Sequence, residues 1–435
     1  MASVSPDDGA VLDVVGVGFG PANLALAIAV REHNAGGSPE QVLRAGFLER
    51  QPRFGWHRGM LIEGATMQVS FLKDLVTMRN PGSAFSFLSY LHDRDRLADF
   101  INQQAVFPSR VEFHDYLEWA AARFTDEVDY DAEVVAVRPV QDGADVVCLD
   151  VVARSADGRE LVRRTRNLVL AQGLRPALPV GVEPGERVWH SSELLPRLNR
   201  LDAAAPVRFV VVGGGQSAAE AVAHLHGRFR DARIHAVLPA YGYQPADDSP
   251  FVNRVFDPAA VDEFHDTPPH VRQLILDRHR NTNYAVVDGE LITHLFRTMY
   301  QERVRGPQRL HLHNLARVVG TRSSADGVDV DVRSLRTEAT TTLRADVVIY
   351  ATGYQPTNPL DVLGEMASSC KIDGDHGLLV GRDHRVVTAA NVHCGIYVQG
   401  STEHLHGLSS TLLSTVAVRA GELVRSLAAA PVPSR

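Results

Sequence analysis

Two glycine-rich segments constrain the fold of this 435-residue chain, and their first glycines lie 197 positions apart. The segments are Gly16-Val-Gly18-Phe-Gly20-Pro21-Ala-Asn23 and Gly213-Gly-Gly215-Gln216-Ser217-Ala218. Each follows a β-branched run, Val11–Val15 or Phe209–Val212, and opens an apolar stretch of helical period, as a strand-to-helix phosphate site requires. Because glycines let the backbone approach a pyrophosphate, the pattern predicts two Rossmann-like dinucleotide-binding units.

A second strand of the first unit is expected at Ala45–Glu49, which ends in an acidic residue. A Rossmann unit places a carboxylate there to bind the ribose hydroxyls, so Glu49 is the candidate ribose ligand. Its separation from Gly16 exceeds the usual spacing of ~20 residues beyond the fingerprint. We attribute the excess to a loop at residues 33–39.

Two further buried-strand patterns, Leu168–Gly173 and Asp346–Gly353, each close on glycine and are followed by proline. After these two strands the chain is expected to cross from one domain to the other and back again, at paired positions. The predicted fold class is α/β, with the second Rossmann-like domain inserted in the first. The expected divisions are 9–178 and 355–428 for the two parts of the first domain, 179–354 for the second, about 245–300 within it for a small, mainly helical substrate-binding insert, and 429–435 for a tail.

Composition and charge exclude several classes of protein. The net charge is −8 and the Lys and Arg residues are scattered, so neither nucleic acid nor a membrane is an expected partner. The three cysteines, Cys148, Cys370 and Cys394, form no CxxC pair, which argues against a disulfide scaffold, a zinc site or a redox dithiol. The same cysteine pattern leads us to expect no metal. The acidic segment Met1–Asp8 lacks the positive region of a signal peptide, so we expect a cytoplasmic location.

A set of ordered motifs is more specific than either turn alone. The motifs are Gly18-Phe-Gly-Pro-Ala-Asn-Leu24, Phe54-Gly-Trp-His57, Met67-Gln-Val-Ser-Phe-Leu-Lys-Asp-Leu-Val-Thr77, Pro108-Ser-Arg-Val-Glu-Phe113, Asp247-Asp-Ser-Pro-Phe-Val-Asn253, Asn281-Thr-Asn-Tyr284, Ala351-Thr-Gly-Tyr354 and His406-Gly-Leu-Ser409. Together, over about residues 11–425, the chain closely resembles the flavin-dependent N-hydroxylating monooxygenases of siderophore biosynthesis, and most of all the L-ornithine N-delta-monooxygenases. The resemblance implies FAD, NADPH, O2, a small basic amino acid as substrate, and a homotetramer or dimer.

The resemblance also assigns cofactor residues, with FAD at the first turn and NADPH at the second. For FAD it implies Gly16, Gly18, Gly20, Pro21, Asn23, Glu49, Trp56, His57, Gln68, His406, Gly407, Leu408 and Ser409. For NADPH it implies Gly213, Gly215, Gln216, Ser217, Asn283, Ala351, Thr352, Gly353 and Tyr354. The segment that begins at His406 is expected to place backbone amides at the pyrimidine end of the flavin.

The reaction implied is hydroxylation of the side-chain amine of L-ornithine through a flavin hydroperoxide. An amine of this type titrates near ~10.4, so its pocket should lack a carboxylate partner and favour the neutral form. By motif position, Lys73 and Asn283 are implied to hold the substrate carboxylate, and Asn253 the α-amino group. Gln68 and Asn283 are the implied catalytic residues, and Gln68 and Ser414 also border the substrate. Lys73 suits this role because its ammonium is a cationic donor.

Three positions depart from the family pattern. The segment Ile234–Gln244 contains no Arg or Lys for the 2′-phosphate of NADPH, so Arg278 or Arg280 is the candidate partner. Ser410 replaces an acidic residue and Thr402 replaces an asparagine. These changes leave L-lysine or a diamine open as the substrate.

Three other functions agree with parts of this sequence pattern. A Baeyer–Villiger-type flavin monooxygenase shares the two-nucleotide plan, but its fingerprint before the second turn is not present around Trp189–Glu193. A pyridine-nucleotide disulfide reductase would need a cysteine pair. A non-catalytic nucleotide-binding sensor would have no reason to keep Gln68, Lys73 and Asn283 together.

Overall fold

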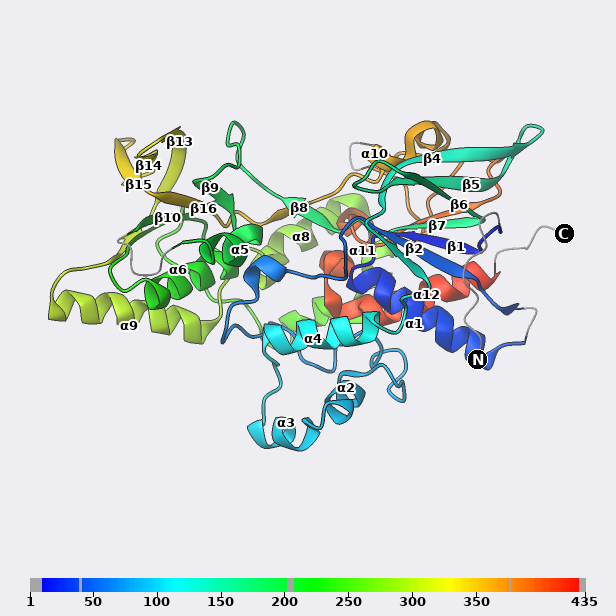
Figure 1. Cartoon of the computed structure of the whole chain (residues 1–435), viewed down its shortest axis with the longest axis horizontal. Coiled ribbons are helices and arrows are strands. Elements are labelled where there is room, and N and C mark those ends of the chain that lie inside the picture. Colours follow the sequence, from blue (N-terminus) through cyan, green and yellow to red (C-terminus); the bar gives the residue numbers. More distant parts are fainter. Residues whose placement is uncertain (1–9, 39–40, 202–206, 375–376, 430–435) are drawn as a thin grey trace.

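Two five-stranded sheets lie at opposite ends of the molecule (Figure 1). The computed structural model describes residues 10–38, 41–201, 207–374 and 377–429, so Met1–Asp8, Pro39 and the tail from residue 430 lie outside it, as does the side chain of Asn283. The first sheet has the order β18-β7-β1-β2-β3, formed by Gly395–Val398, Asn167–Leu170, Val14–Val17, Ala45–Glu49 and Val128–Tyr130. The second has the order β12-β11-β10-β16-β9, formed by Leu310–His313, Arg233–Val237, Arg208–Val212, Val347–Tyr350 and Val188–His190. All neighbouring strands in both sheets are parallel.

The chain passes between the sheets twice, at neighbouring positions. It leaves the first sheet through β8 (Leu174–Pro176) and returns through β17 (Tyr354–Pro356), and these two strands pair antiparallel. Every strand of the second sheet lies between them in sequence. The strand β18 and the helix α12 (Val416–Ala429) then complete the first unit, where α12 packs on α1 (Pro21–Gly36). The predicted fold class, one Rossmann-like unit inserted in another, is therefore confirmed.

The helix α1 is longer than the sequence suggested. It continues to Gly36, so the loop expected at 33–39 is wrong for its first four residues. The Asn34 side chain explains the extension, because it donates to Leu43 O and accepts from Leu43 N, both at 2.9 Å. A side chain that binds the returning chain lets the helix persist through residues that usually favour a turn.

The first unit carries a helical layer below its sheet and a small sheet above it (Figure 1). The helices are α2 (Phe87–Asp93), α3 (Leu97–Gln103) and α4 (Arg110–Ala121). The small antiparallel sheet is β4-β5-β6, formed by Glu133–Asp142, Asp145–Arg154 and Glu160–Thr165. Fully buried aromatic rings, including Phe87, Tyr90, Phe113 and Tyr116, fasten the helices to one another.

The second unit has its own helices and antiparallel sheet. Its helices are α5 (Leu194–Leu198), α6 (Gln216–Arg228) and α9 (Gly289–Arg305), with α9 packed on α6, and its small sheet is β13-β14-β15, formed by Ala316–Ser324, Gly327–Ser334 and Thr340–Ala345. Between β11 and α9 the chain forms the 3-10 helix η4 (Val252–Phe256), α7 (Pro258–Asp266) and α8 (Pro269–Asn283). In the described part of the chain, no helix combines the length and apolar character needed to cross a membrane.

One segment of the first unit belongs to the core of the second. Met60 and Ile62, in and after the 3-10 helix η2 (Arg58–Met60), pack with Trp189 and Phe209 in the second unit. A Cβ added at Gly59 would lie 1.8 Å from Ser192 O, so a larger residue would displace this contact. The two units are therefore joined by this buried contact as well as by the strand pair β8–β17.

Candidate functional site

The first glycine turn has the geometry of a phosphate cradle at the carboxyl end of β1. A Cβ at Gly16 would lie 2.4 Å from Cδ1 of Phe47, and one at Gly18 would lie 2.6 Å from Ala171 O. Gly18 also has φ +81°, a conformation that favours glycine. By contrast, no heavy atom lies within 4 Å of a Cβ at Gly20, the N-cap of α1. The turn is thus tight on the protein side and open at the helix N-terminus, which suits an approaching pyrophosphate.

Two buried polar side chains hold this turn. Glu49, at the end of β2, accepts from Phe19 N at 2.7 Å and from Gln51 N at 2.8 Å. Asn23 donates to Gly18 O at 2.7 Å and accepts from Gln399 Nε2 at 2.9 Å. Glu49 therefore fixes the turn, and its role in binding the ribose stays a prediction. Pro21 is the first residue of α1, where its missing N–H has no cost.

The second glycine turn is built in the same way at the end of β10. A Cβ at Gly213 (φ +146°) would lie 2.3 Å from Ala351 O, which brings the 351–354 segment against the turn. Gly215 is the N-cap of α6, and the Cα of Ala285 would lie 3.5 Å from a Cβ there. The Gln216 amide is engaged with protein, since Nε2 donates to Glu220 Oε1 at 2.9 Å and Oε1 accepts from Asp288 N at 2.8 Å. Ser217 is partly exposed beside it.

Residues assigned to different cofactors meet between the units. The ring of Tyr354 lies 5.7 Å from that of His57 and 5.1 Å from that of His190, and Trp56 lies 4.6 Å from His57. Although the His57 side chain is exposed, surrounding protein and then the Arg110 guanidinium lower its pKa to about 4. Its imidazole is therefore neutral at physiological pH. Thr352 donates to Ala177 O at 2.5 Å, and Gly353 O contacts His190 Nε2 at 2.9 Å.

The loop with Lys73 is organised by a residue that the sequence analysis missed. Asp74 is 2% exposed and accepts from four donors: Val76 N, Thr77 N, Thr77 Oγ1 and Phe87 N. Lys73 is partly exposed, and among the described residues no carboxylate pairs with its ammonium. Gln68 is exposed, directly after the buried Met67. The hydrogen bonds of Asp74 therefore hold the loop that carries the Lys73 ammonium and the Gln68 amide.

The insert, which comprises η4, α7 and α8, reaches the C-terminal part of the first unit. Asn253 lies in η4, which packs on the 3-10 helix η6 (Leu408–Thr411), and its Nδ2 donates to Asp248 O at 2.8 Å. Next to Asn283, Tyr284 donates to Glu403 Oε2 at 2.5 Å, and Arg272 of α8 donates to His404 O at 3.0 Å. Glu403 begins the short helix α11 (Glu403–His406). These contacts bring Asn253 and the end of α8 to the segment that starts at residue 403.

The side chains of this C-terminal segment are covered by protein. His406, Leu408 and Ser409 are each 1% exposed, and Gly407 is buried too. Thr402 and Ser410 are each 2% exposed. Burial and then the neighbouring His384 and His265 lower the pKa of His406 to about 2. A role of residues 406–409 at the flavin would use backbone groups, and it stays a prediction, as does that of the partly exposed Ser414 in the 3-10 helix η7 (Leu413–Thr415).

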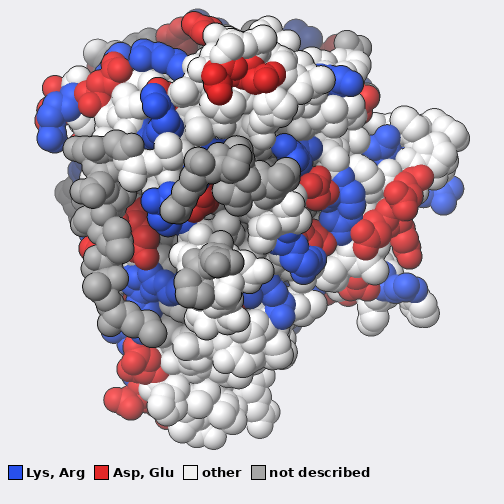
Figure 2. Space-filling view, turned by 90° about the vertical axis from the view of Figure 1, so that its right-hand side faces the viewer, with Lys and Arg blue, Asp and Glu red and all other residues white. Residues whose placement is uncertain are grey.

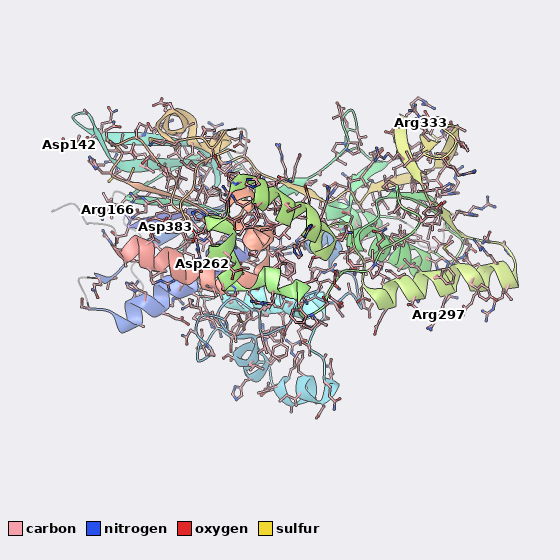
Figure 3. The ribbon with its side chains drawn as sticks, turned by 180° about the vertical axis from the view of Figure 1, so that it is seen from behind. Asp142, Arg166, Asp262, Arg297, Arg333 and Asp383 are labelled. Carbon is pink, nitrogen blue, oxygen red and sulfur yellow. The ribbon has the colours of Figure 1, made fainter. Side chains whose placement is uncertain are left out.

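An ion-pair bridge fastens the insert to the first unit from outside. Arg382 contacts Asp262 of α7 at 2.6 Å and Glu422 of α12 at 2.8 Å. Figure 3 labels Asp262 close to the α12 ribbon and far from Arg297 of α9. The insert helix α7 is therefore attached to the first unit, whereas α9 covers the second.

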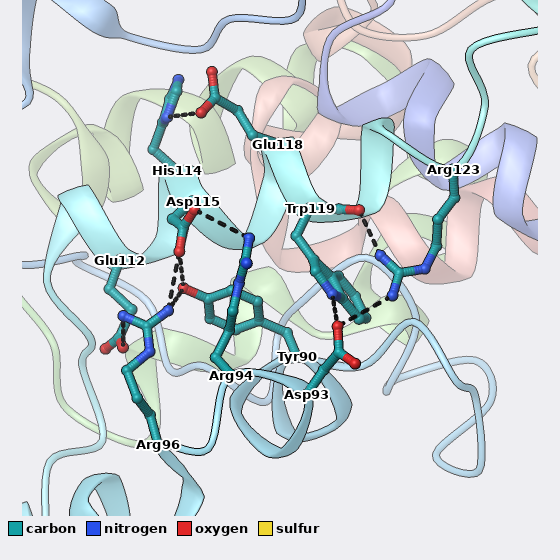
Figure 4. A network of polar contacts seen from close by, with 10 residues as sticks. All are labelled: Tyr90, Asp93, Arg94, Arg96, Glu112, His114, Asp115, Glu118, Trp119 and Arg123. Atoms are coloured by element: carbon teal, nitrogen blue, oxygen red, sulfur yellow. Dashed lines mark hydrogen bonds and ion pairs between the residues drawn. The ribbon is translucent and has the colours of Figure 1, made fainter.

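A polar network joins α4 to the helices below it (Figure 4). Asp115 accepts from Tyr90 Oη at 2.6 Å and from Arg96 Nη2 at 2.9 Å, while Asp93 accepts from Trp119 Nε1 at 2.6 Å. An open groove of about 550 Å³ lies beside these residues, lined in part by Glu112 and Asp115, and no residue of either glycine turn lines it. We regard the network as a support for α4 and place the candidate site at the turns.

Surface charge and potential metal ligands do not help to locate the candidate site. On the face in Figure 2, acidic and basic side chains are interspersed without an extended area of one sign. Within the described ranges, no group of three or more His, Cys, Asp or Glu side chains is arranged to hold a metal ion. Burial raises the pKa of the Cys370 and Cys394 thiols to about 11, so both stay protonated.

Two Rossmann-like units, each with a glycine turn at a helix N-terminus, define a protein that binds two dinucleotides. The class becomes specific on comparison with known proteins. The chain belongs to the L-lysine 6-monooxygenase/L-ornithine 5-monooxygenase family, whose model matches residues 10–356. The family inferred from the ordered motifs is thereby confirmed.

Individual relatives agree with this assignment over nearly their whole length. The chain is 39% identical to an L-ornithine N(5)-monooxygenase of Pseudomonas aeruginosa over 422 residues, 96% of this chain and 94% of that one. It is similar to the structure of an ornithine N-hydroxylase of Kutzneria sp. 744 with reduced FAD, NADP+ and L-ornithine, at 48% identity and a TM-score of 0.91, covering 96% of this chain and 99% of that one. An L-lysine 6-monooxygenase of Pseudomonas syringae is 35% identical, with a TM-score of 0.84 over 96% of this chain and 99% of that one.

Proposed function

We propose that this protein is an FAD- and NADPH-dependent monooxygenase that hydroxylates the side-chain amine of L-ornithine. The balanced reaction takes the amine, O2, NADPH and a proton to the hydroxylamine, water and NADP+. The observation that carries the proposal is the 48% identity, over 96% of the chain, to an ornithine N-hydroxylase whose structure contains reduced FAD, NADP+ and L-ornithine. We further propose that the product serves hydroxamate siderophore or related natural-product synthesis.

The two glycine turns fit the two dinucleotides. At the first turn, the open backbone at Gly20 and the α1 N-terminus would hold the FAD pyrophosphate, and Glu49 the ribose. At the second turn, Gly215 and the α6 N-terminus would hold the NADPH pyrophosphate. Bound FAD supplies hydride acceptance from NADPH and activation of O2. The surrounding residues bind, orient and exclude water.

Lys73 would bind the carboxylate of the substrate. Its ammonium has no carboxylate partner among the described side chains, and the Asp74 hub fixes the loop that carries it. Asn253 would contact the α-amino group, with Gln68, Asn283 and Ser414 nearby. This arrangement would put the Lys73 cation at the carboxylate end of the substrate. The reacting amine would stay neutral more readily if its end of the pocket lacked an acidic partner, as expected from the sequence.

The first test is aerobic NADPH turnover by FAD-loaded protein, with the hydroxylamine product quantified separately. L-ornithine, L-lysine, putrescine and no substrate form the four arms. Product with ornithine alone is expected. Product with lysine or putrescine alone would keep the enzyme class and replace the substrate. NADPH oxidation that gives only peroxide in every arm would exclude amine hydroxylation.

A second test uses the lysine content of the chain. The sequence contains two lysines, Lys73 and Lys371, so amine-selective acylation followed by mass spectrometry can follow each one. Because L-ornithine also consumes the reagent, the rate at Lys73 is compared with that at the exposed Lys371, and saturating L-ornithine should slow Lys73 severalfold relative to Lys371. Lys73→Ala should raise the KM for ornithine roughly 10- to 100-fold, because hydrogen bonds to charged groups contribute about 1.5 to 3 kcal/mol. An equal ratio of the two rates with and without ornithine would exclude the carboxylate role.

We also propose a cytoplasmic homo-oligomer, either a tetramer or a dimer, with domain limits near residues 178 and 354. The support is the family pattern and the position of the strand pair β8–β17. Light scattering coupled to size-exclusion chromatography would give the mass of the assembly.

A further inference from the structure

We propose that Arg110 and Glu220 form an interdomain pair that positions the second glycine turn for hydride delivery. This inference deepens the proposed function and rests on it. Both residues are positioning residues, because they act through the turn and not on the substrate. The pair lies 110 residues apart in sequence and joins α4 of the first unit to α6 of the second.

The contact is bidentate and almost free of solvent. Arg110 Nη1 donates to Glu220 Oε2 at 2.8 Å, and Nη2 donates to Oε1 at 2.7 Å. The Arg110 side chain is 12% exposed and that of Glu220 is 5% exposed. A planar guanidinium with two parallel bonds to a carboxylate fixes both distance and orientation. Such a pair can therefore set the angle between two helices.

Arg110 is fixed firmly on the side of the first unit. It is the first residue of α4, and its N donates to Ala65 O at 2.8 Å while Nη1 also donates to Met60 O at 2.9 Å. The N-cap Ser109 accepts from Glu112 N at 3.1 Å. The network of Figure 4 holds the rest of α4 to α2. Met60 itself packs in the core of the second unit, so Arg110 lies at the crossing between the units.

On the other side, the chain of contacts continues past the NADPH turn. Glu220 Oε1 accepts from Gln216, the first residue of α6, and Gln216 Oε1 accepts from Asp288 N. Asp288 is the N-cap of α9 and accepts from Glu290 N and Leu291 N. Ala285, three residues earlier, lies against Gly215. A shift of Arg110 would thus be transmitted to both sides of the turn that receives the coenzyme.

Charge gives the pair a second effect. Glu220 is buried one turn from the N-terminus of α6, where the helix dipole and the backbone N–H groups would meet the coenzyme pyrophosphate. An uncompensated carboxylate there would oppose anion binding, and Arg110 neutralises it. The two single neutral variants should therefore affect coenzyme binding in opposite directions.

The test compares Arg110→Gln, Glu220→Gln and the double variant, each as FAD-loaded protein. The rate of flavin reduction by NADPH is measured by anaerobic stopped flow, and NADP+ binding by calorimetry. Both single variants should reduce flavin roughly 10- to 100-fold more slowly, since a displacement of about 1 Å can cost 10²-fold. Arg110→Gln should weaken NADP+ binding, and Glu220→Gln should tighten it. The double variant carries no unpaired charge, so it should bind NADP+ normally and still reduce flavin slowly.

The matched control is Glu193→Gln, which breaks the exposed pair that Glu193 forms with Arg197 at 2.9 Å within the second unit. It should reduce flavin at the wild-type rate. Flavin reduction within twofold of wild type in both single variants and the double variant would overturn the inference. It would also be overturned if the variants reduced flavin more slowly only in proportion to a lower content of bound FAD. The measurement uses no ornithine, so failure of the wild type to accept hydride from NADPH would instead overturn the proposed function.

Discussion

The buried carboxylate of Asp74 leads to a quantitative prediction for the substrate loop. Oδ1 accepts from Val76 N at 2.9 Å and from Thr77 N at 2.6 Å, and Oδ2 accepts from Phe87 N at 2.7 Å and from Thr77 Oγ1 at 2.9 Å. Burial raises its pKa, although these bonds act in the opposite direction. The structure therefore retains a costly buried charge for the sake of its four donors.

Asp74→Asn keeps the shape of the side chain and removes one acceptor atom. In the better orientation, Oδ1 still serves Val76 and Thr77, and the Thr77 hydroxyl can rotate to accept from the new amide. The Phe87 N–H then faces another N–H group and stays unsatisfied, which costs about 1 to 3 kcal/mol, and the two remaining bonds lose their charge assistance. We expect a loss of about 2 to 3 kcal/mol in the free energy of unfolding.

Urea unfolding followed by tryptophan fluorescence provides the assay, because the buried Trp119 belongs to the same aromatic core as Phe87. The variant should also raise the KM for ornithine, since Lys73 is the neighbour of Asp74, and leave flavin reduction by NADPH unchanged. Asp126→Asn, at an exposed carboxylate, should alter neither quantity. A loss below about 1 kcal/mol with an unchanged KM would refute the description of Asp74 as the hub of the loop.

Three further predictions concern the two units. Gly18→Ala should raise the Kd for FAD at least tenfold, because positive φ costs about 1 to 2 kcal/mol and its Cβ would lie 2.6 Å from Ala171 O; Gly227→Ala, with open space at its Cβ, should not. Burial, then His313 and His311, lowers the pKa of His235 from 6.5 to about 4, so its neutral form stabilises the fold above pH 6.5 and this contribution is lost as the pH falls toward 4. His235→Gln should make the midpoint of urea unfolding less dependent on pH between 6.5 and 4. Arg280→Gln should raise the KM for NADPH severalfold and leave that for NADH unchanged, as expected for a contact to the 2′-phosphate alone.

The sequence was informative wherever a function depends on local backbone geometry. Both glycine turns, the strands before them and the acidic end of β2 were predicted, because tight turns and buried strands require particular residues at particular spacings. The helix end at Gly36 was misjudged because the deciding contact, from Asn34 to Leu43, crosses to another element. Asp74 was overlooked beside Lys73 because an acidic residue in a polar loop is usually solvated, and no spacing indicates four converging donors.

Such patterns could not predict which residues join the two units. Met60 and Ile62 are apolar, but nothing in the sequence assigns them to the core of the other unit, which they join across a chain separation of more than a hundred residues. The Arg110–Glu220 pair has the same character, since each residue alone is an ordinary charged position near a helix N-terminus. The motif Pro108–Phe113 contains Arg110, but no role could be assigned to that residue from the sequence, and its contact with Glu220 comes from the structure. Two nucleotide sites in separate units must be aligned before hydride can pass between them, and few contacts can fix that alignment as well as a buried bidentate pair next to one of the turns.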